Sequence, residues 1–166
     1  MNVRLRAMEP EDLDLLYQLE NDQDLWKFGG GNVPYSRYLL HDYMTHATGD
    51  IYTDKQVRLM VENVEREVVG MIDLVNFQPQ HLRAEIGIVI RKEHQRKGYA
   101  ETAVRAVMDY AYRVLHLHQL YAIVAESNIP ACRLFSKLDF IVQIELKDWL
   151  YDGKEYQNAV VVQTFL

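Results

Sequence analysis

The stretch Arg91-Lys92-Glu93-His94-Gln95-Arg96-Lys97-Gly98-Tyr99-Ala100 joins an apolar segment, 84–90, to a segment, 100–115, whose apolar residues recur at helical spacing. The first pattern predicts a strand and the second a helix with one buried stripe. A helix begins with unpaired backbone N–H groups and about half a positive charge, so its start attracts a phosphate. Gly98 lets the backbone approach such a ligand closely, and the two basic residues before it add charge. The sequence therefore predicts a phosphate-binding turn.

The surroundings of this turn decide between a ligand site and a simple bend with solvated basic residues. A second strand–helix unit follows, with a strand over 120–124 and a helix that Ser127 or Asn128 can cap, with Pro130 in its first turn. The chain has no Gly-x-x-x-x-Gly-Lys loop, and Gly29-Gly30-Gly31 lacks the flanking strand and helix of a dinucleotide-binding motif. The paired units favour the ligand site.

The remaining segments predict one α+β sandwich around a single mixed sheet. Alternating or continuous apolar runs predict strands, helical spacing predicts helices, and Asp152-Gly153 predicts a hairpin turn. We expect strands at 3–7, 57–62, 68–77, 84–90, 120–124, 140–149 and 156–165, helices after Pro10 and at 35–47, 100–115 and 128–138, and a loop at 22–33.

Length and composition limit the class of protein. The 166 residues suit one domain, 1–166, and 49% hydrophobic with 25% charged residues is typical of a soluble globular protein. No apolar run approaches the ~20 residues that span a bilayer, and no signal-peptide core follows Met1, so we expect a cytoplasmic protein. Cys132 is the only cysteine, which rules out an intramolecular disulfide, and the net charge of -6 disfavours nucleic acid as a partner.

Two motifs resemble those of the GNAT (GCN5-related N-acetyltransferase) superfamily. Gln95 to Ala100 is similar to its coenzyme A loop, and Asn128 to Phe140 is similar to its second signature, Asn-x-x-Ala followed by Leu-Tyr-x-Lys-Leu-Gly-Phe. Within the superfamily the chain is most similar to bacterial spermidine N-acetyltransferases, with ribosomal-protein N-terminal acetyltransferases as close relatives. That likeness rests on Arg83-Ala84-Glu85, the stretch 110–121, and Tyr156-Gln157-Asn158-Ala159.

The resemblance implies an N-acetyltransferase with acetyl-CoA as cosubstrate and a mixed, mostly antiparallel sheet that splays between its fourth and fifth strands, with helices on both faces. The exposed strand edge would pair with the pantetheine arm, and Gly87 is placed for a bulge that would open the gap. Relatives are often dimers or larger. The implied coenzyme contacts are Ile88, Val89 and Ile90 for pantetheine, Gln95, Arg96, Lys97, Gly98, Tyr99 and Ala100 for the pyrophosphate, and Asn128 and Phe135 from the second unit.

The implied reaction moves acetyl from a thioester directly to an amine, which must be neutral to attack. A primary amine with a pKa of about 10.4 is held back by about 4.6 kcal/mol at pH 7, whereas an α-amine loses only about 1 kcal/mol. Glu85, an acid in an apolar strand, is the candidate proton acceptor, directly or through a water. The alternative is that Glu85 is exposed or pairs with Arg83 or Arg91.

The chain departs from the family pattern at the position of the usual general acid. Phe135 stands where many relatives have the tyrosine that protonates the departing thiolate, and a phenyl ring has no proton to give. Ser136, Cys132, water or a tyrosine from another segment are the remaining sources. The departure also raises the alternative of an acyl-CoA-binding sensor without turnover.

Two further departures concern the backbone and the acceptor side. Asp139 stands where the pattern has glycine at a helix end, so we predict a positive φ there. Spermidine acetyltransferases tend to carry paired acids in the loop before Pro-Tyr, whereas here Gly30-Gly31-Asn32-Val33 precede Pro34-Tyr35.

The acceptor itself is predicted only as a class. An acidic first segment would attract a cationic amine, or would be an ordinary solvated helix face. We therefore expect a polyamine or similar small amine, with a protein N-terminus as the alternative, and no metal, since His116 and His118 lack a ligand set. The acids are Glu9, Glu11, Asp12, Asp14, Glu20, Asp22 and Asp24, and Trp26, Phe28 and Tyr35 either wall an acceptor slot or close the core.

Overall fold

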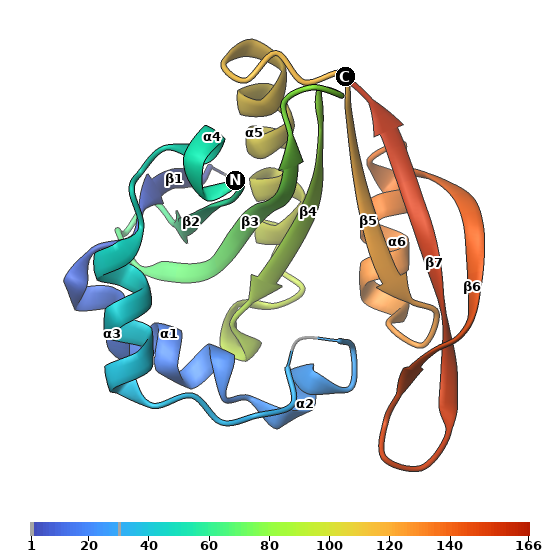
Figure 1. Ribbon diagram of the computed structural model, residues 1–166, viewed down its shortest axis with the longest axis horizontal. Coiled ribbons are helices and arrows are strands. Elements are labelled where there is room, and N and C mark those ends of the chain that lie inside the picture. The colour runs from blue at the N-terminus through green and yellow to red at the C-terminus, as the bar shows by residue number, and fades with distance from the viewer. Residues whose placement is uncertain (1, 30) are drawn as a thin grey trace.

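The computed structural model describes residues 2–29 and 31–166, so Met1 and Gly30 lie outside the described residues. The chain forms one sheet flanked by helices (Figure 1). The strands are β1 (Arg4–Ala7), β2 (Val57–Glu62), β3 (Val68–Gln78), β4 (Arg83–Ile90), β5 (Gln119–Ala125), β6 (Ile141–Tyr151) and β7 (Tyr156–Phe165). The helices are α1 (Leu13–Glu20), α2 (Gln23–Trp26), α3 (Arg37–His46), α4 (Ile51–Asp54), α5 (Tyr99–Arg113) and α6 (Ile129–Lys137), with 3-10 turns η1 (Pro10–Asp12) and η2 (Lys92–His94).

The sheet has the order β1-β2-β3-β4-β5-β7-β6, and β4 and β5 form its parallel pair. These two strands pair only from Arg83↔Gln119 to Glu85↔Tyr121. Beyond Glu85 they diverge, which leaves a wedge between the two halves of the sheet (Figure 1). The predicted mixed, mostly antiparallel sheet that splays between strands four and five is confirmed.

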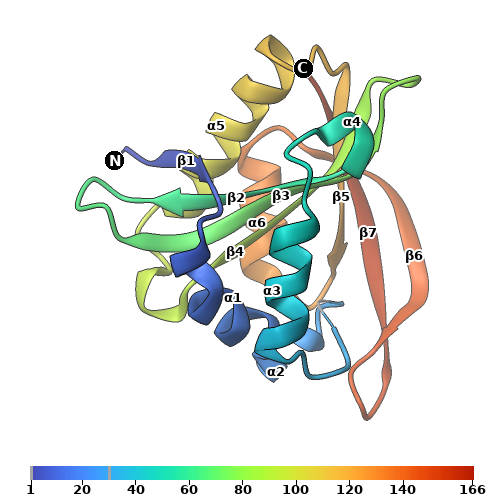
Figure 2. The same cartoon turned by 60° about the vertical axis from the view of Figure 1, so that its left-hand side comes forward.

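Helices cover both faces of the sheet. Figure 2 shows α1 and α3 in front of β2, β3 and β4, with α5 and α6 behind. The larger core lies on the α5 and α6 side and includes Val104, Val107 and Phe135, whereas Leu16 and Leu40 pack with methionines of β2 and β3 on the other side. The sheet is therefore fixed on both faces, and its wedge is the part that strand pairing leaves open.

The predicted bulge at Gly87 is wrong. Gly87 pairs with Asp73 in a register that is continuous from Glu85 to Ile90, and the irregularity of this strand pair lies between Val75 and Gln78. The reason is that β4 keeps its regular antiparallel ladder with β3, so the wedge opens by loss of pairing on the opposite edge. A bulge is therefore not required to expose that edge.

Two short helices lie inside segments without a predicted helix. Asp22 caps α2 by accepting a hydrogen bond from the Asp24 amide, and Asp50 caps α4 by accepting one from the Tyr52 amide. These aspartates are the sequence signal that an apolar-periodicity argument overlooks in a helix of one turn. No helix in the described part of the chain is long and apolar enough to cross a membrane.

Two local predictions are confirmed. Asp139 has a φ of 63°, so an aspartate occupies the left-handed position that the family pattern gives to glycine. Asn128, rather than Ser127, is the N-cap of α6, and its Oδ1 accepts from the Ala131 amide at 3.3 Å. Both residues fix the ends of the helix that borders the wedge.

Candidate active site

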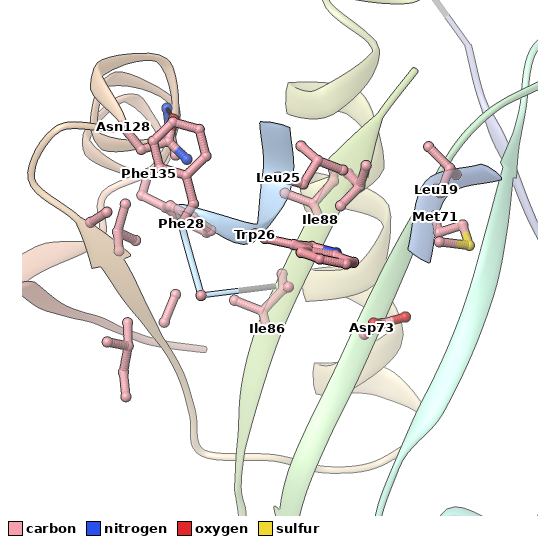
Figure 3. Close-up of a pocket in the computed structure, with 18 of the residues that line it drawn as sticks. Leu19, Leu25, Trp26, Phe28, Met71, Asp73, Ile86, Ile88, Asn128 and Phe135 are labelled. Carbon is pink, nitrogen blue, oxygen red and sulfur yellow. Dashed lines mark hydrogen bonds between the residues drawn. The ribbon is translucent and has the colours of Figure 1, made fainter. Parts of the chain in front are cut away.

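A cavity of about 320 Å³ occupies the wedge between β4 and β5. Figure 3 shows Phe28, Phe135 and Asn128 at one side of it and Asp73 with Met71 at the other. The cavity thus joins the second strand–helix unit to the face of β3 that α1 and α3 cover. Its lining comes from β4 (Ile86, Gly87, Ile88, Val89), β5 (Ala122, Ile123, Val124, Ala125), α6 and its cap (Asn128, Ala131, Phe135), the α2 region (Leu25, Trp26, Phe28, Gly29), and Leu19, Glu20, Arg58, Met71 and Asp73.

The edge of β4 that faces the wedge carries unpaired backbone groups. The Arg91 amide donates to the Val69 carbonyl at 2.9 Å, so residues 91, 89 and 87 direct their N–H and C=O groups toward β3. By the same alternation Ile88 and Ile90 direct theirs toward the wedge, where β5 has already diverged. An extended ligand lying in the wedge can pair with these two residues as a strand would, whereas Val89 contributes only its side chain.

Gln95 occupies part of this edge. Its Nε2 donates to the Ile90 carbonyl at 3.0 Å, across the η2 turn. The bond satisfies the last carbonyl of β4 and holds the turn against the strand end. Ile88 therefore offers both a donor and an acceptor to a ligand, while Ile90 offers its N–H.

The start of α5 is built to receive an anion. Gly98 occupies the N-cap position with a φ of 82°. It has no side chain, so it cannot accept a hydrogen bond from the free amides of the first turn. The backbone hydrogen bonds of the helix begin with the one from the Thr102 amide to the Gly98 carbonyl, so the amides of the first turn have no partner within the helix. Arg96 and Lys97 are exposed beside them, and Arg96 is also left-handed, with a φ of 61°.

The second strand–helix unit completes the coenzyme end of the wedge. Asn128 and Phe135, which the sequence predicts as coenzyme contacts, both line the cavity. The Asn128 cap uses Oδ1, so Nδ2 is the group that can donate to a ligand. Phe135 is 4% exposed and packs edge-on against Phe140, with ring centroids 4.9 Å apart. None of the described residues that line the cavity is a tyrosine. The lining therefore offers no phenol that could donate a proton in place of the tyrosine that Phe135 replaces.

The opposite end of the cavity holds two carboxylates against one guanidinium. Arg58 donates to both oxygens of Asp73, at 2.8 and 2.9 Å, and to Oε1 of Glu20 at 2.6 Å. Burial alone would lower the pKa of Arg58, but the hydrogen bonds and charge of Asp73 and the charge of Glu20 raise it. Two carboxylates and one guanidinium give the cluster a formal charge of minus one, which favours a cationic ligand.

Of this cluster the sequence indicated only Glu20, as one of several acids in the first segment, and neither Arg58 nor Asp73. The three members of the cluster lie on α1, β2 and β3, so no local motif contains them. One signal was available, because Asp73 is a lone acid in the almost continuous apolar run of β3, where an acid needs a partner or a purpose. Asp73 also lies opposite Gly87, whose missing side chain leaves open space beside the carboxylate.

Glu85 lies next to the cavity but not in its lining. It shares a face of β4 with Gly87, at the closed end of the wedge where β4 still pairs with Tyr121 of β5. Its Oε2 accepts from Asn76 Nδ2 at 2.7 Å, and it forms no ion pair with any other described residue. Burial and the nearby Glu85 carboxylate raise the pKa of Tyr121. Among the described residues Glu85 forms no ion pair with Arg83 or Arg91. Arg91 pairs instead with Glu67 and Glu93.

The acidic first segment divides by location. Glu20 is its one member that lines the cavity. Asp12 and Asp14 pair with Arg6 and Arg37, away from the cavity, and Asp22 and Asp24 bridge to Lys92. Trp26 and Phe28 do line the cavity, whereas Tyr35 packs in the core beside α1 and α3. Among residues 2–29 and 31–166 no cluster of three potential metal ligands occurs.

Comparison with known proteins places this geometry in a family. The model of the acetyltransferase (GNAT) domain matches residues 2–141. A spermidine N(1)-acetyltransferase of Escherichia coli K12 is 34% identical over 163 residues, which cover 96% of this chain and 83% of that protein. A crystal structure of spermidine N-acetyltransferase from Vibrio cholerae, in complex with CoA and spermine, superposes with a TM-score of 0.89 at 27% identity and covers 98% of this chain and 95% of that one.

A second structure of the Vibrio cholerae enzyme, described as dodecameric, has a TM-score of 0.84 at 28% identity and covers 98% of this chain and 93% of that one. The wedge, the unpaired β4 edge and the uncapped start of α5 are the features that a long diphosphate-containing thioester fits. The family match and this fit confirm the resemblance stated from the sequence. The chain belongs to the GNAT family and is an acetyltransferase that uses acetyl-CoA as its cosubstrate.

Proposed function

We propose that this enzyme acetylates a primary amine of a small polyamine-like acceptor by direct attack on acetyl-CoA in a ternary complex. The observation that carries the proposal is the net negative cluster of Glu20, Arg58 and Asp73 at one end of a cavity whose other end meets the coenzyme side of the wedge. The relatives named as spermidine acetyltransferases support the same acceptor class.

The coenzyme would lie along the wedge. Its pantetheine arm would form backbone hydrogen bonds with Ile88 and Ile90. Its pyrophosphate would accept hydrogen bonds from the amides at the start of α5, with the charges of Arg96 and Lys97 nearby. Gln95 would hold the turn, and the Nδ2 of Asn128 would donate from the other side. Bound in this way, acetyl-CoA supplies an activated acetyl group at the junction of the two ends of the cavity.

The acceptor would bind through its positive charge. Arg58 holds Asp73 and Glu20 in place by hydrogen bonds, and the two carboxylates would attract the ammonium groups of a polyamine. Trp26 and Phe28 add apolar walls for the carbon chain between those groups. The two carboxylates at this end of the cavity favour an acceptor with several positive charges, such as a polyamine, over a protein N-terminus, which contributes a single α-amine.

Proton transfer would involve Glu85 through water. Glu85 accepts a hydrogen bond from Asn76 but has no cationic partner among the described residues, so it is free to take a proton. Asp73 is different, because both of its oxygens are already engaged by Arg58. We assign binding of the ammonium to Asp73 and removal of its proton to Glu85. The departing thiolate would take its proton from water, since Phe135 has none to give.

We infer that residues 1–166 act as one catalytic domain, because a single sheet runs from β1 to β6 and both of its halves line the cavity. We also infer a homo-oligomer, by analogy with the relative described as dodecameric. Sedimentation velocity tests this second inference. A monomer at micromolar concentration would refute it.

Release of CoA from acetyl-CoA tests the acceptor class. The purified enzyme should turn over spermidine and spermine with a higher kcat/KM than peptides with a free N-terminus. Preference for the peptides would replace the proposed acceptor by a protein N-terminus. Binding of CoA without turnover of any acceptor would identify an acyl-CoA-binding sensor. That alternative is favoured by the buried Phe135, because a phenyl ring cannot donate a proton to the thiolate.

A further inference from the structure

The segment 22–29, which we name the α2 arm, borders the acceptor end of the cavity and is fastened by ion pairs to the η2 turn that follows β4. The arm contributes Leu25, Trp26 and Phe28 to the cavity lining. Figure 3 shows the Trp26 ring projecting between Leu25 and Ile86. The indole Nε1 also donates to the Glu20 carbonyl at 3.0 Å. The arm therefore sets how much of the acceptor end is open.

On the β4 side the fastening is an ammonium held by two carboxylates. Lys92 Nζ lies 2.8 Å from Asp24 Oδ2 and 3.3 Å from Asp22 Oδ2. Asp22 is also the N-cap of α2, and it uses its other oxygen, Oδ1, for the Asp24 amide. One lysine thus meets both acids of a single helical turn.

On the other side the arm reaches the second half of the sheet. A Cβ added to Gly29 would lie 3.4 Å from Cδ2 of Leu150, a residue of β6. Gly29 has no side chain, so its backbone lies close to an apolar side chain of β6 without being fastened to it. The arm consequently spans the wedge from the turn after β4 to the β6–β7 hairpin, so a change at either side can alter the opening of the acceptor slot.

Lys92 belongs to η2, which begins immediately after Arg91 and ends just before Gln95. The short turn that leads into the coenzyme loop therefore also carries the residue that fastens the cover of the acceptor slot. Because Lys92 and Asp24 are 62% and 72% exposed, the fastening can open, and salt screens it. Removing the charge at residue 92 should loosen the arm without changing the cavity walls on the sheet.

We propose that Lys92 is a specificity-determining residue, which fastens the α2 arm across the acceptor end and so restricts the acceptor to slender amines. The restriction rests on the proposed amine acetyltransferase function, whereas the fastening itself does not. The described ion pairs of Lys92 are with Asp22 and Asp24, and none of these three residues lines the cavity, so we assign Lys92 a positioning role in turnover.

The fastening is tested by fluorescence of Trp26 in a Trp149→Phe background, where Trp26 is the only tryptophan. Lys92→Asp should shift the emission to longer wavelength, because it sets three carboxylates against one another and exposes the indole. The charge exchange Lys92→Asp with Asp24→Lys should restore the original emission. Arg113→Asp, which breaks an exposed ion pair at the far end of α5, is the matched control and should change nothing. An unchanged emission in Lys92→Asp would overturn the fastening.

The restriction is tested by steady-state kinetics on the same variants. Lys92→Asp should raise the KM for spermidine about two- to fivefold, the size expected for an exposed ion pair, and should raise the kcat/KM of a peptide N-terminus relative to spermidine. The charge exchange should reverse both changes, and the affinity for CoA by calorimetry should stay the same in all variants.

Two results would overturn the restriction while leaving amine acetylation intact. One is an unchanged ratio of peptide to spermidine turnover, and the other is a fall in CoA affinity that the exchange fails to restore, which would make Lys92 a coenzyme contact. Lack of turnover of every amine by the unmodified enzyme would instead overturn the proposed function and the restriction together. The fluorescence result would still decide the fastening.

Discussion

The two ends of the cavity differ in the groups that they present to a ligand. In the proposed binding mode the coenzyme end would use backbone groups, namely the open edge of β4 and the amides at the start of α5, within one continuous stretch of chain. The acceptor end uses side chains of Glu20, Arg58 and Asp73, which come from three separate elements. Backbone recognition leaves a local motif because it needs a glycine and a helix start at fixed spacing, whereas side-chain recognition leaves none.

The coenzyme end should be the more sensitive to a single substitution. Gly98→Glu forces a side chain into a position with a φ of 82° and sets a carboxylate against the diphosphate, so we expect the affinity for CoA to fall about 100-fold or more, which is about 2.8 kcal/mol. Calorimetry with CoA measures the change. Gly153→Glu is the matched control, because Gly153 also has a positive φ, 96°, and lies in the β6–β7 turn with open space around it. An equal loss of CoA affinity in both variants would contradict the assignment of the diphosphate site to the start of α5.

Substitution of Glu85 tests whether this residue, which lies next to the cavity, removes the proton of the amine. Glu85→Gln keeps the hydrogen bond from Asn76 but cannot take a proton, so kcat for a polyamine should fall about 100-fold at pH 7. The deficit should narrow toward pH 10, because the free amine then loses its proton to solvent, given its pKa of about 10.4. Rate measurements from pH 7 to pH 10 decide this, with the exposed Glu65→Gln as control. A deficit that does not vary with pH would assign Glu85 a structural role.

The acceptor end should respond more moderately and mainly through KM. Asp73→Asn removes the net negative charge of the cluster, and kcat/KM for spermidine should fall about 10- to 100-fold, or about 1.5–3 kcal/mol. The affinity for CoA should be unchanged. Asp14→Asn, in an exposed ion pair with Arg37, is the control for loss of a carboxylate on the same side of the sheet. If the Asp73 variant lost CoA affinity instead, the division of the cavity into two ends would be wrong.

An ion pair remote from both ends supplies the baseline for stability. Burial would raise the pKa of Asp12, but hydrogen bonds from Arg6 and from the Glu9 amide outweigh it and lower the pKa. The stabilisation is therefore present above the unfolded pKa of about 3.9 and is lost as the pH falls through the lower, folded value. Asp12→Asn should reduce the free energy of unfolding by about 1–3 kcal/mol at pH 7 and by less at pH 3. Urea titrations at the two pH values measure this, and a constant difference would contradict the assignment.

The contrast between the two ends also explains what could be predicted from the sequence. Strand and helix periodicity, the Gly98 turn and the Asn128 cap are local patterns, and the structure confirms the elements they predicted. The Gly87 bulge was wrong because β4 keeps a regular ladder with β3, and the wedge results from the loss of pairing between β4 and β5 beyond Glu85. Arg58 and Asp73 were missed because their roles exist only once β2, β3 and α1 are assembled.

Amide hydrogen exchange resolved by NMR tests most directly that the coenzyme completes the sheet along the open edge of β4. Addition of CoA should slow exchange of the Ile88 and Ile90 amides, which face the wedge, while the Val89 amide, already directed at β3, should change little. If CoA bound with Ile88 and Ile90 exchanging as fast as before, the coenzyme would have to bind elsewhere than along this edge.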